Sequence, residues 1–252
     1  MSKSLCFAVL LLLASQSARA QARSQSPAAI TLLNRMADII GEFHACSFHL
    51  KVAQDVLDDT LGTLVKRHSA QQVYMVGPDK MLVNFRGEKG HRGFWYDGIH
   101  ASYYSYDENN FTRLNAPRTI IATIDSLHSA YGIDFPAADF FYPSFVSDLI
   151  AQSQRIAYLG TATVAGKECF HIVAASAVQD VQIWIADDAT VLPVKYVIRT
   201  KEKGSDKEFE ATFYDWQVNP DLPNSMFTFT PPPGAREIRM LARNASRTGN
   251  RP

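Results

Sequence analysis

Apolar and polar residues alternate with a period of two through most of the chain from Cys46 to Thr230. Because successive side chains of a β-strand point to opposite faces of its sheet, this pattern predicts strands that bury one face. In the first half the strands form a meander of hairpins that begins at Cys46 and runs to Tyr106. In the second half we expect strands over residues 155–162, 167–175, 179–187, 191–200, 207–218 and 226–230.

Two segments have the 3.6-residue spacing of an amphipathic helix instead. The first covers residues 28–43 and carries one apolar face. The second is a central insertion that begins near Pro117, which suits the first position of a helix, with Asn115 as its expected cap. Its apolar residues repeat until Gly132, and short aromatic turns punctuated by prolines follow over residues 133–150.

The number of strands restricts how this sheet is built. About ten or eleven antiparallel strands in one sheet cannot remain flat, because the twist between neighbours accumulates. The sheet must curl, and its concave apolar face must then be covered by the N-terminal helix and the central insertion. We therefore expect a mainly β (α+β) fold, an unclosed half-barrel of about ten or eleven strands under an N-terminal helix and a central helical lid.

The first twenty residues have the features of a cleaved signal peptide. Lys3 precedes an apolar run of ten residues, and Ala18 and Ala20 supply the small side chains that a signal peptidase needs. The run is about half of the roughly 20 residues that a membrane-spanning helix needs. We expect the chain to comprise a signal peptide over residues 1–20, a linker over 21–27, one domain over 28–234 and a basic, flexible tail over 235–252.

Composition and motifs exclude several function classes. Lysine and arginine number 25 and aspartate and glutamate also 25, so the basic excess of a nucleic-acid-binding protein is missing. The chain contains no G-x-S-x-G elbow, H-E-x-x-H helix or C-x-x-C pair. Cys46 and His49 are three residues apart on one expected strand and point to opposite faces, so we expect no metal site there. Neither a catalytic residue nor a cofactor is expected.

Two cysteines follow the expected signal peptide, Cys46 and Cys169. They are either two separate buried thiols that pack as small apolar groups, or one disulfide. A disulfide between them would close a loop of more than 100 residues and contribute up to about 4–5 kcal/mol in the chain-entropy model. The sequence leaves both alternatives open.

Several short motifs resemble those of a predicted-periplasmic bacterial family of unknown function. They are Arg86-Gly87 through Phe94-Trp95-Tyr96-Asp97-Gly98, Tyr131-Gly132-Ile133 with Ala138-Asp139, Gln182-Ile183-Trp184-Ile185 with Leu192-Pro193-Val194-Lys195-Tyr196, and Phe227-Thr228-Phe229-Thr230-Pro231-Pro232 with Gly234-Ala235. The order of elements is similar to the lipoprotein-carrier superfamily of Gram-negative envelopes, the LolA/LolB-like fold. The resemblance covers about residues 28–238 and implies a half-barrel fold and a periplasmic location. It also implies an apolar ligand, because carrier members of this superfamily hold acyl chains in the hollow under the lid.

We interpret the chain as a non-enzymatic periplasmic binding or carrier protein. Its partner would be an apolar small molecule, a lipid or a lipidated protein, shielded between the concave sheet and the lid. The protein is expected to be a monomer whose basic tail touches the membrane surface transiently. The residues expected to line the ligand are Phe48, Leu50, Val52, Met81, Val83, Phe85, Ile120, Ile124, Leu127, Phe140, Phe141, Phe145, Ile183 and Ile185.

Two other hypotheses are compatible with the same residues. The chain could be an envelope interaction module with a plugged core, which docks a protein on its outer face through aromatic residues such as Trp95 and Trp184. It could also be a hydrolase of a lipidic substrate that uses a histidine with an aspartate. Insensitivity to every His→Ala change would exclude the hydrolase.

Overall fold

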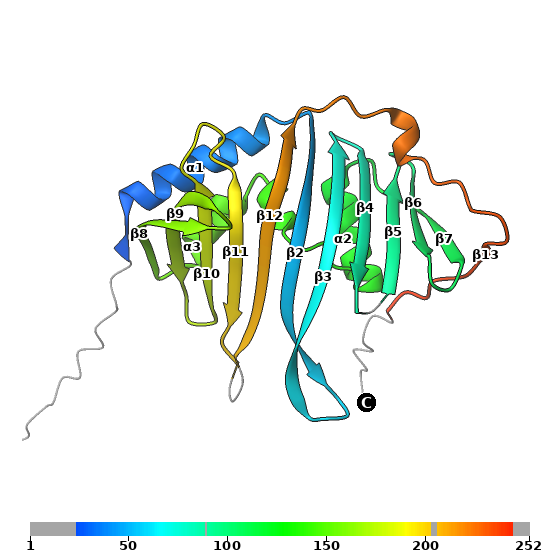
Figure 1. The fold of residues 1–252 in the computed structure, drawn as a ribbon, viewed down its shortest axis with the longest axis horizontal. Helices are drawn as coiled ribbons and strands as arrows, with labels where there is room; N and C mark the ends of the chain where they lie inside the picture. The colour runs from blue at the N-terminus through cyan, green and yellow to red at the C-terminus, as the bar shows by residue number, and fades with distance from the viewer. Residues whose placement is uncertain (1–23, 89, 203–205, 244–252) are drawn as a thin grey trace, which may run out of the picture.

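A computed structural model of the protein describes residues 24–88, 90–202 and 206–243 (Figure 1). One 13-stranded sheet has the order β1-β8-β9-β10-β11-β12-β2-β3-β4-β5-β6-β7-β13. The short strands β1 (Ser24–Gln25) and β13 (Arg236–Glu237) pair in parallel with β8 and β7 and do not pair with each other. The strands from β2 to β12 are antiparallel, so the prediction of an unclosed sheet with ten or eleven antiparallel strands is confirmed.

The remaining elements have the following bounds. The antiparallel strands are β2 (Ala45–Asp58), β3 (Thr63–Val76), β4 (Lys80–Gly87), β5 (Gly90–Tyr96), β6 (His100–Ser105), β7 (Asn110–Asn115), β8 (Arg155–Val164), β9 (Lys167–Ala175), β10 (Gln179–Ala186), β11 (Pro193–Thr200) and β12 (Lys207–Val218). The helices are α1 (Pro27–Gly41), α2 (Ile120–Tyr131) and α3 (Phe145–Gln152), with 3-10 turns η1 (Ala138–Phe141) and η2 (Asn224–Phe227).

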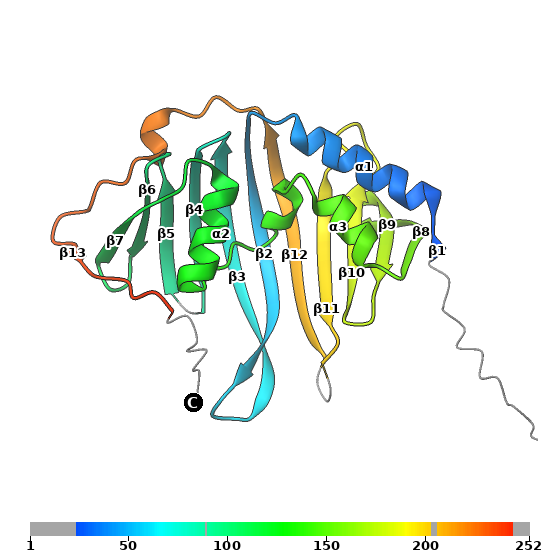
Figure 2. The ribbon, with the colours of Figure 1, turned by 180° about the vertical axis from the view of Figure 1, so that it is seen from behind.

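All three helices lie on one face of the curled sheet, as Figure 2 shows. Helix α1 crosses the half of the sheet that contains β8 to β11, and α2 lies over the half that contains β3 to β5. The expected cover, an N-terminal helix and a central lid, is therefore the observed one. The expected signal peptide over residues 1–20 lies outside the described residues.

Helix α1 is held at its start by the residues expected in the linker. The Ser26 hydroxyl accepts a hydrogen bond from the Ala29 backbone N–H at 3.4 Å, and Pro27 occupies the first helical turn, where its missing N–H costs nothing. The Ser26 backbone N–H donates to the Ile156 carbonyl at 2.9 Å, which ties the helix start to β8.

The start of α2 differs from the prediction. Its cap is Thr119, whose hydroxyl accepts from the Ala122 N–H at 3.2 Å, and not Asn115. Pro117 lies before the helix, and its carbonyl accepts hydrogen bonds from the Tyr96 hydroxyl at 2.5 Å and the Thr123 hydroxyl at 3.2 Å. The end agrees, since Gly132 follows the last helical residue with a left-handed φ of 66°.

The chain after β12 forms a segment that we call the C-terminal strap, residues 219–243. It crosses the outer face of the sheet and lays Phe229 on three aromatic rings, with centroids 4.9 Å from Trp95, 5.5 Å from Phe111 and 5.7 Å from Tyr104. The expected strand over residues 226–230 is therefore wrong. Its alternating phenylalanines pack onto an existing sheet face, and part of the segment is the turn η2.

The prediction of a flexible tail is wrong for residues 235–243, which belong to the strap. Strand β13 pairs with β7, and the Ile238 backbone N–H donates to the Phe111 carbonyl at 2.7 Å. The Arg243 backbone N–H donates to the Ala130 carbonyl at 2.7 Å, so the strap reaches the end of α2. These backbone hydrogen bonds do not depend on the arginine-rich composition from which the tail was predicted. Residues 244–252 lie outside the described residues.

The strap requires a glycine beneath Trp95. A Cβ on Gly93 would stand 2.2 Å from the Trp95 ring, which is held from the other side by Phe229. We expect Gly93→Ala to lower the free energy of unfolding by about 1–3 kcal/mol, since overpacking forces the ring out of place. Urea denaturation measures this. Gly41→Ala is the control, because a Cβ there meets no atom within 4 Å, and equal stabilities of the two variants would contradict the packing.

Cys46 and Cys169 are both buried free thiols, so the disulfide alternative is not realised. They belong to separate apolar clusters. Cys46 lies in the main core under the helices, whereas Cys169 packs with Ala186 and Val194 in a small second cluster.

Candidate functional site

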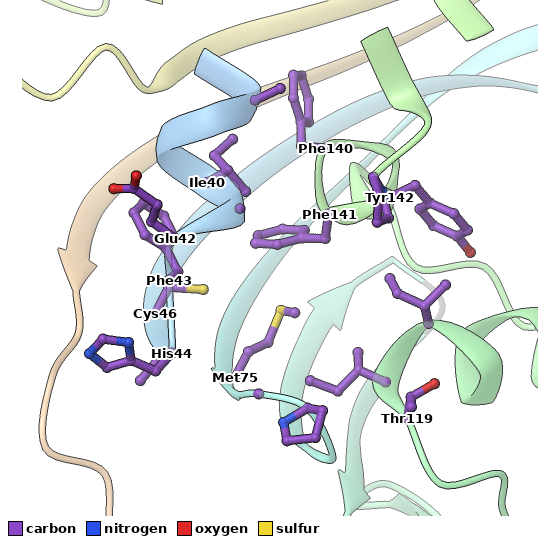
Figure 3. Close-up of a pocket in the computed structure, with 18 of the residues that line it drawn as sticks. Ile40, Glu42, Phe43, His44, Cys46, Met75, Thr119, Phe140, Phe141 and Tyr142 are labelled. Carbon is purple, nitrogen blue, oxygen red and sulfur yellow. The ribbon is translucent and has the colours of Figure 1, made fainter. Parts of the chain in front are cut away.

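A pocket of about 770 Å³ opens between the C-terminal end of α1 and the N-terminal end of α2 (Figure 3). Its floor is the start of β2 and the end of β3, and η1 with the residues after it forms the third side. The lining residues are Ala37, Asp38, Ile40, Gly41, Glu42, Phe43, His44, Ala45, Cys46, Met75, Gly77, Pro78, Thr119, Ile120, Ile121, Phe140, Phe141, Tyr142 and Pro143.

Backbone hydrogen bonds fix the elements around this pocket. The Gly77 N–H donates to the His44 carbonyl at 2.8 Å, and the Ile120 N–H donates to the Pro78 carbonyl at 2.9 Å. The His44 and Ala45 N–H groups both donate to the side-chain oxygen of Asn219, at 3.0 and 3.1 Å. The two helix ends are thus positioned by the same turn of the sheet, and the first residue of the strap holds the connection from α1 to β2.

A second, much smaller hollow lies deeper, between the sheet and α2. It measures about 20 Å³ and is lined by Phe48, Gln71, Val73, Met75, Met81, Val83, Ile124, Phe135, Pro136, Ala137, Ala138 and Phe141. Met75 and Phe141 line both spaces. The Phe141 ring stacks on Phe48 with centroids 5.8 Å apart and an interplanar angle of 12°. Phe141 and Met75 therefore lie between the pocket and the smaller hollow.

The polar groups of the pocket lie at its rim. Asp38, Glu42 and His44 are at least partly exposed, and the Tyr142 hydroxyl donates to the Asp125 carboxylate at 2.7 Å. Burial, together with this hydrogen bond and the negative charge of Asp125, raises the pKa of Tyr142. Burial also raises the pKa of the Cys46 thiol to about 12, so the thiol in the pocket wall stays protonated at neutral pH. The site can enclose an apolar molecule, and the Cys46 thiol in its wall is not a nucleophile.

The residues predicted to line a ligand are mostly buried together. Phe141 and Phe145 are partly buried against the main core, whereas Phe85 is half-buried outside it, because it lies near the end of β4 away from the lid. Phe85 borders a shallow hollow with polar residues such as Gln72 and Asn84. The other predicted residues are buried in the core, namely Phe48, Leu50, Val52, Met81, Val83, Ile120, Ile124, Leu127, Phe140, Ile183 and Ile185.

Only part of that predicted set borders either space. Ile120, Phe140 and Phe141 line the pocket, and Phe48, Met81, Val83 and Ile124 join Phe141 around the smaller hollow. The pattern missed Gly41, Glu42, Met75 and Tyr142, which come from helix ends, a strand end and a loop. Periodicity identifies the face of an element, and it carries no signal for which ends of different elements meet.

Three histidine–aspartate pairs occur away from the pocket among the described residues, and in one of them His100 Nδ1 lies 3.9 Å from an Asp97 oxygen. His49 Nδ1 lies 3.0 Å from an Asp215 oxygen on the outer face, and His128 Nδ1 lies 2.7 Å from an Asp134 oxygen near the end of α2. Within residues 24–88, 90–202 and 206–243, no group of three or more His, Cys, Asp or Glu side chains could hold a metal ion. The same described residues contain no helix long and apolar enough to cross a membrane.

Comparison with known proteins gives a family and a set of structures. Residues 29–241 match the family described as "Predicted periplasmic protein (DUF2092)". An uncharacterized conserved protein from Thermus thermophilus is 12% identical with a TM-score of 0.48, covering 84% of this chain and 99% of that one. The lipoprotein LppX of Mycobacterium tuberculosis is 17% identical with a TM-score of 0.45, covering 78% and 100%. A LolA superfamily protein from Nitrosomonas europaea is 10% identical with a TM-score of 0.36, covering 80% and 97%. No curated protein matches the sequence.

Proposed function

The chain belongs to the predicted periplasmic protein family DUF2092, and from this premise we propose that it is a non-enzymatic binding or carrier protein for a hydrophobic ligand in the periplasm. The observation that carries the proposal is the pocket between α1 and α2. Its volume of about 770 Å³ lies within the range of about 300–1,000 Å³ that small-molecule sites occupy. Somewhat more than half of its wall is apolar, and the side chains of Asp38, Glu42 and His44 are exposed.

Apolar contact provides the driving force. Each Å² of apolar ligand surface removed from water contributes roughly 25 cal/mol, so an acyl chain that buries about 200 Å² gains about 5 kcal/mol before the cost of ordering. The resemblance to lipoprotein carriers favours an acyl chain, free or attached to a lipoprotein, as this ligand.

Phe141 provides a route from the pocket to the space under the lid. Its ring is half-buried and, with Met75, lines both spaces. A rotation of this side chain away from Phe48 would join them and make room for the end of a chain between the sheet and α2. In this proposal the ligand enters at the rim, and Met81, Val83 and Ile124 contact its inner end.

One observation favours the interaction module as a second candidate. The hollow under α2 is only about 20 Å³, so the core beneath the lid is nearly filled. Of the two aromatic residues proposed for docking, Trp95 is covered by Phe229 of the strap. Trp184 is half-buried, stacked on His171 with centroids 4.2 Å apart. A docking module would give one dominant protein adduct on periplasmic crosslinking, whereas a carrier would give lipid adducts.

A side chain at Gly41 tests the carrier directly. Gly41 lines the pocket and a Cβ there meets no atom within 4 Å, so a larger side chain can occupy the pocket without a backbone clash. We expect Gly41→Trp to weaken binding of the uncharged dye N-phenyl-1-naphthylamine at least tenfold, because the indole takes the ligand's place. Gly41→Ala, the matched control, should bind like the wild type.

The measurement is dye fluorescence in titration, with native mass spectrometry of the protein purified from membranes to detect a retained lipid. Absence of dye binding and of any lipid in the wild type would contradict the carrier. Undiminished binding by Gly41→Trp, with its fold intact by circular dichroism, would place the ligand elsewhere.

A further inference from the structure

The charges at the pocket rim have one sign. Among the described residues that line the pocket, the carboxylates are Asp38 and Glu42, and none is a lysine or arginine. This differs from the chain as a whole, in which basic and acidic residues are equal in number. Both carboxylates are exposed at the end of α1, and Figure 3 shows Glu42 at this helix end with its carboxylate directed away from Phe141.

The end of α1 adds to this negative potential. A helix carries about half a negative charge at its C-terminal end, and the last turn of α1 contains no basic residue. The Glu42 N–H donates to the Asp38 and Ile39 carbonyls at 3.2 and 3.3 Å, which offsets part of this charge. Asp125 accepts a hydrogen bond from the Tyr142 hydroxyl but does not line the pocket.

The groups of opposite sign are weaker or engaged elsewhere. The N-terminal end of α2 carries about half a positive charge, but the Ala122 N–H is taken by the Thr119 hydroxyl and the Ile120 N–H by the Pro78 carbonyl. Lys80, two residues beyond Pro78, has its ammonium 3.3 Å from Asp79. Arg118 precedes Thr119 but does not line the pocket.

Among the described residues that line the pocket, His44 is the one titratable group that could become positive. The variants of Asp38 and Glu42 described below separate its effect from that of the carboxylates.

From this arrangement we propose that the ligand's polar end is not anionic, and that the pocket takes amphiphiles with an uncharged or cationic end in preference to carboxylates or phosphates. The inference rests on the proposed function and names the ligand class for the same pocket. An apolar chain in the pocket leaves its polar end at the rim, near Asp38 and Glu42. An anionic end there is repelled by both carboxylates, and a cationic one is attracted.

Three ligands of equal chain length test the selection. Dodecanoate is anionic, monododecanoylglycerol is uncharged and dodecylammonium is cationic, and each is used below its micelle concentration to displace N-phenyl-1-naphthylamine at pH 8. We expect dodecanoate to bind about five- to tenfold more weakly than the monoglyceride at low salt. This gap in affinity between the two ligands should narrow in about 0.5 M NaCl, because salt screens the charges.

Charge-neutralising variants isolate the cause. In D38N/E42Q, the ratio of the dodecanoate dissociation constant to that of the monoglyceride should fall toward one. The control D59N/D187N removes the same charge at two exposed turn positions outside the pocket and should leave the gap in place. Equal binding of the three ligands by the wild type, or an unchanged gap in D38N/E42Q, would overturn the inference and leave the carrier function standing. If the dye and all three ligands fail to bind, the carrier function itself falls, and the inference falls with it.

Discussion

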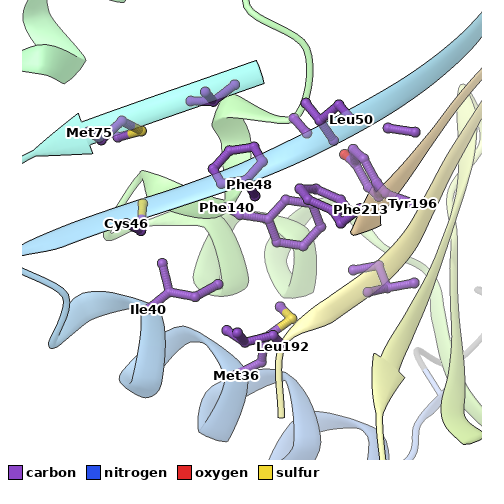
Figure 4. Packing of buried hydrophobic residues seen from close by; sticks show 14 of the residues in the cluster. Met36, Ile40, Cys46, Phe48, Leu50, Met75, Phe140, Leu192, Tyr196 and Phe213 are labelled. Carbon is purple, nitrogen blue, oxygen red and sulfur yellow. The ribbon is translucent and has the colours of Figure 1, made fainter. Parts of the chain in front are cut away.

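Phe140→Ala is expected to lower the free energy of unfolding by about 3–5 kcal/mol. Phe140 is 3% exposed, and its ring centroid lies 4.9 Å from those of Phe145 and Tyr196 and 5.5 Å from that of Phe213. One side chain of η1 thus joins the lid to α3, β11 and β12, as the packing in Figure 4 shows. Its removal leaves a cavity that these rings cannot fill without moving apart. Urea denaturation followed by tryptophan fluorescence measures the loss.

Two variants control this prediction. Phe140→Leu keeps much of the buried volume and should cost less than half as much. Phe145→Ala removes a ring that is only partly buried and should also cost less. A Phe140→Ala protein within about 1 kcal/mol of the wild type would show that the lid is not anchored by this ring. The same variant would then be expected to keep its dye affinity, since the lid would not depend on the contact.

The sequence predicted the features that depend on one element at a time. Alternation identified the antiparallel strands, and helical spacing placed α2 between Ile120 and Gly132. The same alternation named a concave face on which Phe48, Ile183 and their neighbours are buried in one core. These predictions succeed because burial imposes the same period on every strand of a curled sheet, wherever its partner lies.

The missed features depend on contacts between distant segments. Phe227 and Phe229 alternate like strand residues, but Phe227 is buried in the turn η2, and Phe229 packs on aromatic rings of the outer face of β5 to β7. The open pocket is likewise made where the ends of α1, β3 and α2 meet. The prediction that Phe85 lines the ligand is not met, because the end of β4 that carries Phe85 extends beyond the region that the lid covers. The periodicity of a strand does not show how far the helices that cover its sheet extend.

Cys46 makes the folded protein sensitive to alkaline pH. The thiol is 2% exposed in the wall of the pocket, and its burial raises the pKa from 9.0 to about 12. In the unfolded chain the thiol loses its proton near pH 9, whereas in the folded protein it keeps the proton until about pH 12. The unfolded state is therefore favoured progressively as the pH rises between these values, and below the lower one the two states bind this proton equally.

We expect the free energy of unfolding of the wild type to fall more steeply with pH than that of Cys46→Ala between about pH 9 and 12, by roughly 4 kcal/mol in total. Tyrosine and lysine titrations act on both proteins and cancel in the difference. Urea denaturation at several pH values from about 8 to 11 measures the two slopes. Cys169→Ala is the control: Cys46 remains in place there, so its contribution to the slope should persist. If the free energies of unfolding of the wild type and Cys46→Ala changed in parallel with pH, the prediction would be contradicted. That result would show that water reaches the Cys46 thiol in the pocket wall.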